Sequence, residues 1–127
     1  MSSFWIYMLV VVALIPVSML LISRWFKKGG PQEINGISGY RTKRSMQNID
    51  TWRFAHTYCG ALLERVSVVA LPVSVVVMVA VRTAGENFFA LVAMVLTAAQ
   101  LVSLFVCVAL TERALKQRFS QAGKPRA

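Results

Sequence analysis

The stretch FWIYMLVVVALIPVSMLLIS, residues 4–23, decides the fold class. It runs for twenty residues without a charged side chain, and a helix of about twenty residues is about 30 Å long, which matches the hydrocarbon core of a bilayer. Three positive side chains follow within residues 24–28, whereas a cleavable signal peptide carries its positive charges before the apolar stretch. The sequence therefore predicts a retained transmembrane helix over residues 1–23, which we expect Pro16 to kink.

Two later stretches also predict membrane helices. Residues 88–110 contain no charged side chain and are long enough to cross a bilayer. The uncharged part of the other stretch, residues 66–81, is too short to do so. We therefore extend the predicted helix to residues 61–82 and place Glu64 and Arg65 in its first turn, where long side chains reach the headgroups.

The composition excludes the main soluble classes. Hydrophobic residues make up 57% of the 127 residues and charged residues 15%, against roughly 25% charged residues in a typical soluble domain. A chain this short cannot bury so much apolar surface in water, and intrinsic disorder requires low hydrophobicity. The two cysteines are too few for a disulfide scaffold. We predict an all-α integral membrane protein with three transmembrane helices.

The positive charges predict the orientation in the membrane. The loop 24–60 carries seven Lys and Arg against two acidic residues, and the tail 111–127 carries five against one. Lys and Arg accumulate on the cytoplasmic side, so we expect a cytoplasmic loop, a cytoplasmic tail, and an outside turn at 83–87. The N-terminus is then outside. Because topology accounts for the net charge of +9, we expect no direct nucleic-acid binding.

Small and weakly polar residues form stripes on the second and third predicted helices. Such stripes let membrane helices approach closely and form hydrogen bonds; the alternative is a polar path for a solute. Pro72 is expected to break the second helix and to free the carbonyl of Val68 for a partner on the third helix. The stripe residues are Gly60, Ser67 and Ser74 in the second helix, and Ala93, Thr97, Gln100, Ser103 and Cys107 in the third.

The cytoplasmic loop holds the densest motif, GISGYRTKRSMQNIDTWRFAH, residues 36–56. Asp50 is a suitable helix N-cap, and an apolar stripe follows it. We predict an amphipathic interfacial helix from about Thr51 that leads into the second span, with Trp52 as its interface anchor. The stripe consists of Trp52, Ala55, His56, Cys59, Leu63 and Val66.

This motif resembles the signature of the SdpI/YfhL family of bacterial membrane proteins. Its namesake is the immunity protein against a secreted sporulation-delay toxin and also captures a transcriptional repressor; it has more spans than the three predicted here. The resemblance implies a multi-pass protein of the bacterial plasma membrane, with a peptide toxin and a cytosolic regulator as partners. The residues that carry it are Gly39, Tyr40, Arg41, Thr42, Ser45, Asn48, Trp52 and Ala55, and we add Arg44 and His56 to the predicted site.

The basic residues of the motif have two interpretations. Arg41, Lys43 and Arg44 are expected to attract anionic headgroups, by about 1 kcal/mol each. Arg41 is in addition expected to grip one specific group with its planar fork, either a ligand or an internal carboxylate such as Asp50 or Glu64. Lys43 is expected to set topology alone. We predict that Ser45 and Asn48 are turn or cap residues.

No catalytic, metal or cofactor pattern emerges from the sequence. His56, Cys59 and Cys107 are possible metal ligands, but their spacing falls short of a recognised site and buried packing is the expected role. The sequence offers no Ser-His-Asp set, paired carboxylates or phosphate-binding loop, so we expect a non-enzymatic protein without cofactor or metal. The alternatives to an immunity function are a regulatory subunit of a larger membrane protein and a lipid- or solute-handling protein.

Overall fold

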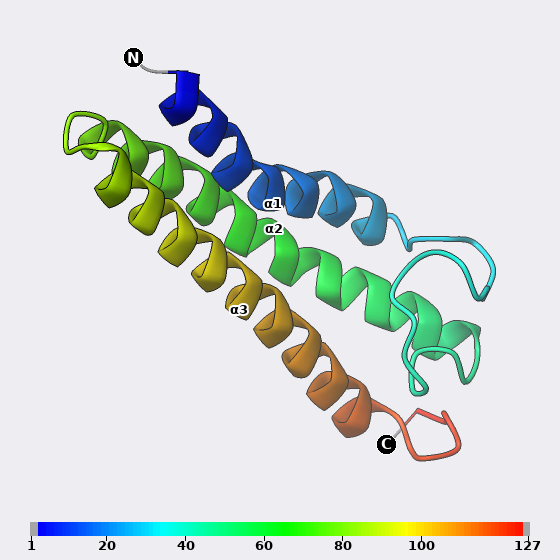
Figure 1. Cartoon of the computed structure of the whole chain (residues 1–127). Helices are drawn as coiled ribbons and strands as arrows, with labels where there is room; N and C mark the ends of the chain where they lie inside the picture. Colours follow the sequence, from blue (N-terminus) through cyan, green and yellow to red (C-terminus); the bar gives the residue numbers. More distant parts are fainter. Residues whose placement is uncertain (1–2, 126–127) are drawn as a thin grey trace.

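The computed structural model describes residues 3–125. It contains three helices, α1 (Ser3–Lys27), α2 (Ile49–Ala80) and α3 (Glu86–Arg118), joined by a long loop and a tight turn. Figure 1 shows α2 running beside both α1 and α3, and α1 also contacts α3. Each helix is long and apolar enough to cross a membrane. The prediction of an all-α protein with three spanning helices is confirmed.

All three helices extend beyond the predicted spans. α2 begins at Ile49, so the segment predicted as an interfacial helix forms the first turns of one continuous helix; its position at the membrane surface remains a prediction. α3 continues through residues 111–118, which we had assigned to the tail. The side chains of this segment include Ala, Leu, Lys, Gln, Arg and Glu, which are strong helix formers. That propensity explains why α3 continues beyond its apolar stretch.

The N-cap of α2 differs from the prediction. Asn48 is the cap residue, not Asp50, and it forms a capping box with Thr51. Asn48 Oδ1 accepts from the Thr51 backbone N–H at 2.9 Å, and Thr51 Oγ1 accepts from the Asn48 N–H at 3.1 Å. Asp50 lies in the first turn instead, where its carboxylate interacts favourably with the positive end of the helix dipole. The predicted cap role of Asn48 is confirmed.

Small residues lie at the contacts between the helices. A Cβ added to Gly60 would lie 2.8 Å from Phe26 Cβ and 2.9 Å from the Lys27 amide nitrogen, so α1 and α2 nearly touch there. The second-helix stripe of Gly60, Ser67 and Ser74 is buried. In the third-helix stripe Ala93, Gln100 and Cys107 are buried, whereas Thr97 and Ser103 are half-buried. The predicted packing role of these stripes is confirmed at the buried positions.

The two helical prolines act differently from each other. α1 changes direction near its middle (Figure 1) and contains the buried Pro16. Pro72 lies inside α2, which remains one helix. Within the described residues, α3 donates no hydrogen bond to the Val68 carbonyl, so that predicted partner is wrong. Instead, Gln100 of α3 donates to the carbonyl of Val12, four residues before Pro16.

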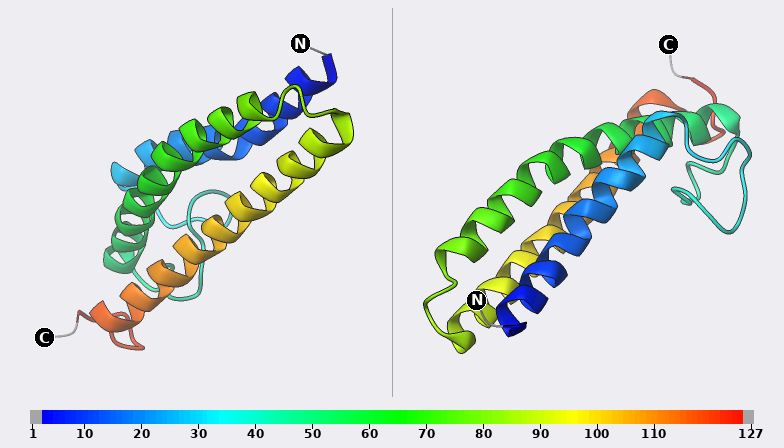
Figure 2. Two further views of the ribbon diagram at one scale, coloured as in Figure 1. Left: turned by 90° about the vertical axis from the view of Figure 1, so that its left-hand side faces the viewer. Right: turned by 90° about the horizontal axis from the view of Figure 1, so that it is seen from above.

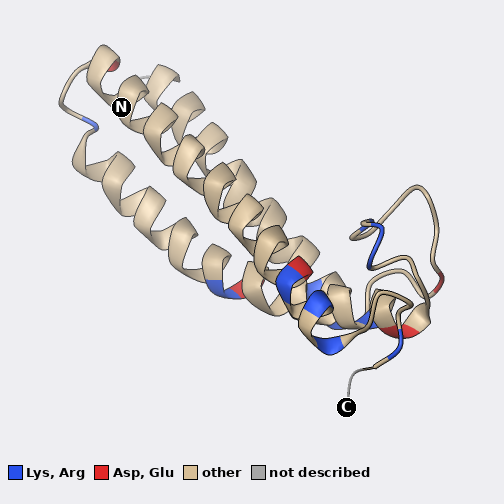
Figure 3. Ribbon diagram, turned by 90° about the horizontal axis from the view of Figure 1, so that it is seen from below, with Lys and Arg blue, Asp and Glu red and all other residues tan. Residues whose placement is uncertain are grey.

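The charged residues gather at one end of the bundle. Figure 3 shows Lys and Arg concentrated around the α1–α2 loop and the C-terminal part of α3. Figure 2 shows this loop folded against the end of the bundle where α3 finishes, while α1 begins at the opposite end. Large apolar side chains remain exposed along all three helices, among them Leu21, Val76 and Phe105. The arrangement supports the N-out and C-in orientation, which remains a prediction.

Candidate functional site

His56 is the centre around which the predicted motif folds. The imidazole is fully buried. Its Nδ1 lies 2.7 Å from the Trp52 carbonyl oxygen, and its Nε2 accepts from the Tyr40 backbone N–H at 2.8 Å. Because a carbonyl only accepts and a backbone N–H only donates, the proton is on Nδ1 and Nε2 is a bare acceptor. His56 is therefore a neutral structural bridge between α2 and the loop.

Aromatic rings and two glycines enclose this imidazole. The rings of Phe26 and Trp52 lie 4.7 and 4.4 Å from it, centroid to centroid. A Cβ on Gly39 would lie 2.5 Å from His56 Nε2, and a Cβ on Gly30 would clash with the ring as well. Both glycines have positive φ, +94° and +67°, which side-chain-bearing residues rarely adopt. The motif glycine at position 39 is thus required by conformation and by space.

Trp52 is a core residue rather than an interface anchor. Its side chain is fully buried, and its Nε1 donates to the Pro31 carbonyl oxygen at 2.8 Å. An anchor would present its ring to the headgroups, so the predicted anchoring role is wrong. The reason is that the loop 28–48 folds back and covers this face of α2. Ala55, on the same face, is also fully buried.

Tyr40 connects the motif to α3. Its hydroxyl donates to Glu112 Oε1 at 2.7 Å, and the Val108 carbonyl oxygen lies 3.2 Å away. Burial, reinforced by the adjacent Glu112 carboxylate, raises the pKa of the Tyr40 phenol, so the hydroxyl remains a donor at physiological pH. Through its N–H and its hydroxyl, this one residue joins the loop to both α2 and α3.

Thr42, Ser45 and Thr51 form a connected turn in the second half of the motif. Ser45 Oγ lies 2.9 Å from the Tyr40 carbonyl oxygen and accepts from the Thr42 N–H at 2.9 Å. Thr51 Oγ1 lies 3.0 Å from the Ser45 carbonyl oxygen. Asn48 Nδ2 donates to the Gly123 carbonyl oxygen at 2.7 Å, which brings in the C-terminal tail. Ser45 and Asn48 are turn and cap residues, as predicted.

Arg41 faces outward from the hydrogen-bonded residues Tyr40, Ser45, Trp52 and His56, which we call the frame of the motif. Its guanidinium is exposed and donates to the Gly36 carbonyl oxygen. Within residues 3–125 it forms no ion pair with Asp50 or Glu64, and Glu64 pairs with Lys27 at 3.1 Å instead. Those two expected partners are therefore wrong. The rigid loop holds the base of Arg41 in place while the guanidinium keeps donors for an external group.

The other basic residues lie on a different part of the same end. Lys43 is exposed and Arg44 is half-buried. Together with Gln47, Glu112 and Gln121 they line a shallow hollow of about 350 Å³. The hollow mixes both signs of charge, so it offers a weaker attraction to anions than Arg41 does. The structure does not bring these two residues together with Arg41 into one pocket.

A larger groove opens between α1 and α3 beside the motif. It has a volume of about 520 Å³ and is lined by apolar side chains of both helices, including Leu14, Ile22 and Leu104. The loop residues from Gly39 to Thr42, with Arg41 among them, line the same groove. Tyr40 bonds to the Val108 backbone, so the loop closes the groove at the end where α1 finishes. The positively charged Arg41 thus lies at one end of an apolar groove.

His56, Cys59 and Cys107 were considered as possible metal ligands but expected to be packing residues. Residues 3–125 hold no group of three His, Cys, Asp or Glu side chains able to bind a metal ion. Cys59 and Cys107 are both buried in the apolar cluster that also contains Phe26, Tyr40 and Leu115. His56 has both nitrogens engaged.

Several residues that contact the motif were not predicted from the sequence. Gly30 lies outside the predicted site, although it packs on His56. Glu112 and Gly123, more than 60 residues away along the chain, bond to the motif. One signal was available for Glu112, because an acidic residue at the cytoplasmic end of an apolar span needs a partner.

One comparison with known proteins gave a match. A family model described as the SdpI/YfhL protein family matches residues 32–110. The match covers every residue of the predicted motif together with all of α2 and most of α3, and it leaves out α1. Comparisons with curated proteins and with solved structures gave no match.

Proposed function

The chain belongs to the SdpI/YfhL protein family, and from that premise we propose that it is a non-enzymatic immunity-type protein of the bacterial plasma membrane. It protects the membrane from a secreted peptide toxin and signals through its cytoplasmic basic loop. The three membrane-spanning helices fit such a role. The partners under this proposal are a membrane-active peptide and a cytosolic regulator.

The orientation of Arg41 carries the proposal. Most of the motif faces inward: Tyr40, Ser45, Trp52 and His56 are buried and hydrogen-bonded within the chain. A buried, fully bonded frame positions whatever side chain it leaves outside. Arg41 is one such side chain, and a guanidinium suits a carboxylate or phosphate better than an ammonium does because of its planar fork. The partner that Arg41 fits is a protein that presents a carboxylate or a phosphate group.

The two activities use different parts of the molecule. A secreted peptide reaches the chain through the bilayer, where the exposed apolar faces of the helices meet it. The basic loop lies at the opposite end from the predicted outer turn. Since Tyr40 ties the loop to α3 and His56 ties it to α2, a peptide that shifts the helices also shifts Arg41. This coupling is how protection and signalling would be linked.

Survival of a sensitive bacterium tests the proposal. The chain is expressed heterologously and the cells are challenged with candidate membrane-active peptides, while the membrane-fraction abundance of the protein is measured in parallel. We expect the wild type to protect against at least one peptide and Arg41→Lys to lose most of that protection at unchanged abundance. Lys43→Ala is the matched control, because it removes a neighbouring exposed charge and is expected to protect fully.

Failure to protect against any peptide at normal abundance would overturn the immunity proposal. Full protection by Arg41→Lys would leave immunity standing but would refute the specific contact, since the lysine keeps the charge and loses the fork.

The groove between α1 and α3 favours one second function, lipid handling. An acyl chain would occupy its apolar part and an anionic headgroup would meet Arg41. Purification in a mild detergent followed by native mass spectrometry tests this function. A bound anionic lipid that is lost in Arg41→Ala supports it, and protein that carries no lipid argues against it.

A further inference from the structure

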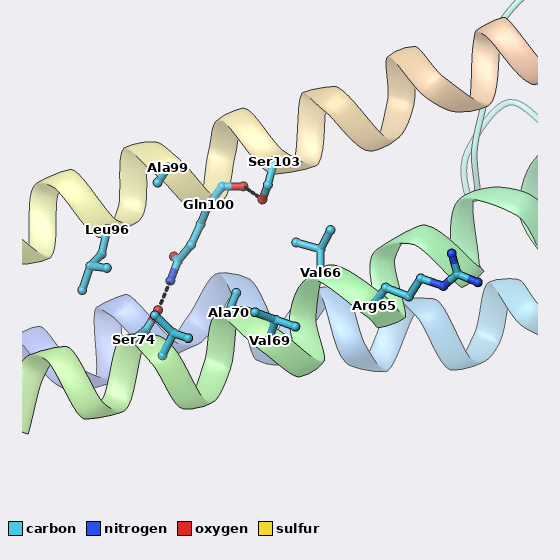
Figure 4. A pocket seen from close by; sticks show the side chains of 10 residues that line it. Arg65, Val66, Val69, Ala70, Ser74, Leu96, Ala99, Gln100 and Ser103 are labelled. Atoms are coloured by element: carbon cyan, nitrogen blue, oxygen red, sulfur yellow. Dashed lines mark hydrogen bonds between the residues drawn. The ribbon is translucent and has the colours of Figure 1, made fainter.

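A second groove lies between α2 and α3, away from the motif. It has a volume of about 440 Å³ and its lining is almost entirely apolar. Figure 4 shows the Gln100 side chain of α3 reaching across it to Ser74 of α2. The groove is lined by Arg65, Val66, Val69, Ala70, Val73, Ser74, Leu96, Ala99, Gln100 and Ser103.

Gln100, which lines this groove, carries an unused hydrogen-bond acceptor. Its side chain is only 4% exposed. The amide nitrogen uses both of its protons, one on the Val12 carbonyl oxygen at 3.1 Å and one on Ser74 Oγ at 2.9 Å. The amide oxygen, Oε1, is buried and has no hydrogen-bond partner within the described residues. Exchanging the amide oxygen and nitrogen would bring two acceptors together at Val12, so the orientation is fixed.

The depth of Gln100 limits what can satisfy this oxygen. Residue 100 lies near the middle of the uncharged stretch 88–110, where a bilayer supplies no water. An unsatisfied acceptor is costly there. The acyl chains of lipids carry no hydrogen-bond donor, and lipid headgroups lie about half a bilayer away. A donor at this depth has to come from a side chain on another membrane-embedded helix.

The shape and charge of the groove suit a helix. The side chains beside Gln100 are small, namely Ala70, Ala99 and Ser103, and small residues allow two helix backbones to approach closely. Arg65 lines the groove nine residues before Ser74 on α2, which places its exposed guanidinium about 13 Å toward the cytoplasm. An acidic residue on the incoming helix would meet this cation.

We propose that the α2–α3 groove binds a transmembrane helix of a partner polypeptide. The incoming helix presents a hydroxyl or amide donor to Gln100 Oε1 and an acidic side chain to Arg65. This site does not depend on the immunity function or on the motif around Arg41. It assigns the chain a helix-binding face inside the bilayer.

Energy transfer between labelled protein and designed helices in phospholipid vesicles tests the proposal. The probes are apolar transmembrane helices with one glutamate at the cytoplasmic end and either threonine or the isosteric valine at mid-depth, used at low density. Interhelical hydrogen bonds in bilayers are modest, so we expect the threonine helix to bind the wild type about three- to tenfold more tightly than the valine helix. Gln100→Leu should abolish this preference.

A second variant guards against a folding defect in Gln100→Leu. Ala70→Leu fills the groove without touching the hydrogen bonds of Gln100, and it should weaken both probes equally. Equal binding of both probes by the wild type, or a threonine preference that survives in Gln100→Leu, would overturn the proposal. Self-association of the wild type that blocks both probes and is lost in Ala70→Leu would also overturn it, because the occupant would then be a second copy.

Discussion

The side-chain nitrogen of Gln100 lies 3.1 Å from the carbonyl oxygen of Val12, the carbonyl that Pro16 leaves without its helical donor. A proline has no N–H for the carbonyl four residues earlier, and in a bilayer no water replaces it. Gln100 supplies the missing donor from α3. The bend in α1 and the polar residue in α3 are therefore parts of one interaction, separated by 88 positions in the sequence.

We predict that Pro16 and Gln100 are energetically coupled. Pro16→Ala restores the backbone N–H at position 16, which then competes for the Val12 carbonyl. Gln100→Leu should consequently lower the free energy of unfolding by about 0.6–1.7 kcal/mol less in the Pro16→Ala background than in the wild type. Reversible unfolding in mixed micelles of the four proteins of the cycle measures the difference.

Ser74→Ala provides the control for this cycle. It removes the other acceptor of the Gln100 amide and leaves the Val12 carbonyl unchanged, so its effect should be nearly the same in both proline backgrounds. Additive effects of Pro16→Ala and Gln100→Leu would show that the contact contributes nothing to stability.

The sequence predicted the kind of interaction but assigned it to the wrong proline. The Val68 carbonyl, freed by Pro72, was expected to find a partner on the third helix. The rotation of the three helices about their axes decides which carbonyl faces Gln100, and that rotation follows from packing between distant residues. The hydrophobic spans, in contrast, were readable because their length and lack of charge are local properties.

We predict a graded series for alanine substitutions in the loop glycines. Gly39→Ala meets both an unfavourable φ and the His56 ring, so it should destabilise the protein by more than the strain term alone, which is about 1–3 kcal/mol. Gly29 has φ +105° but open space around its Cβ position. Gly29→Ala should therefore lower the free energy of unfolding by the backbone strain energy alone. Thermal unfolding monitored in detergent ranks the variants.

Gly36→Ala is the neutral reference of this series. Its added Cβ meets nothing within 4 Å, and its φ does not fall in the strained range. We expect the order Gly36→Ala, Gly29→Ala, Gly39→Ala in increasing loss of stability. A Gly39→Ala variant as stable as Gly29→Ala would mean that the His56 ring yields without cost.

The motif illustrates what a family-like pattern does and does not reveal. The residues were identified from their spacing, and the turn and cap roles of Ser45 and Asn48 were predicted correctly. Trp52, in contrast, was assigned to the membrane surface, and Arg41 to either a ligand or an internal carboxylate. The loop 28–48 has no apolar periodicity, so its path over α2 was not predictable. That path buries Trp52 and His56 and leaves Arg41 exposed.

We predict that the Tyr40 hydroxyl stabilises the contact between the loop and α3. Tyr40→Phe keeps the ring and removes the donor to Glu112, and hydrogen bonds to charged groups contribute about 1.5–3 kcal/mol. The free energy of unfolding should fall by an amount in this range. Tyr58→Phe is the control, since the Tyr58 ring stacks on Phe54 and its hydroxyl makes no hydrogen bond within residues 3–125. Equal effects of the two substitutions would contradict the prediction.

Cysteine labelling in intact cells tests the orientation. Thr83 lies in the turn between α2 and α3 and is exposed, while Ile37 in the basic loop is 89% exposed; both sites accept a cysteine without disturbing packing. The native Cys59 and Cys107 are buried, which keeps the background low. Because Lys and Arg concentrate on the loop side and positive loops stay in the cytoplasm, a membrane-impermeant maleimide should label Thr83→Cys. Ile37→Cys should react only after the cells are permeabilised. The opposite pattern would place the basic loop outside, and Arg41 would then face the medium from which a secreted peptide arrives.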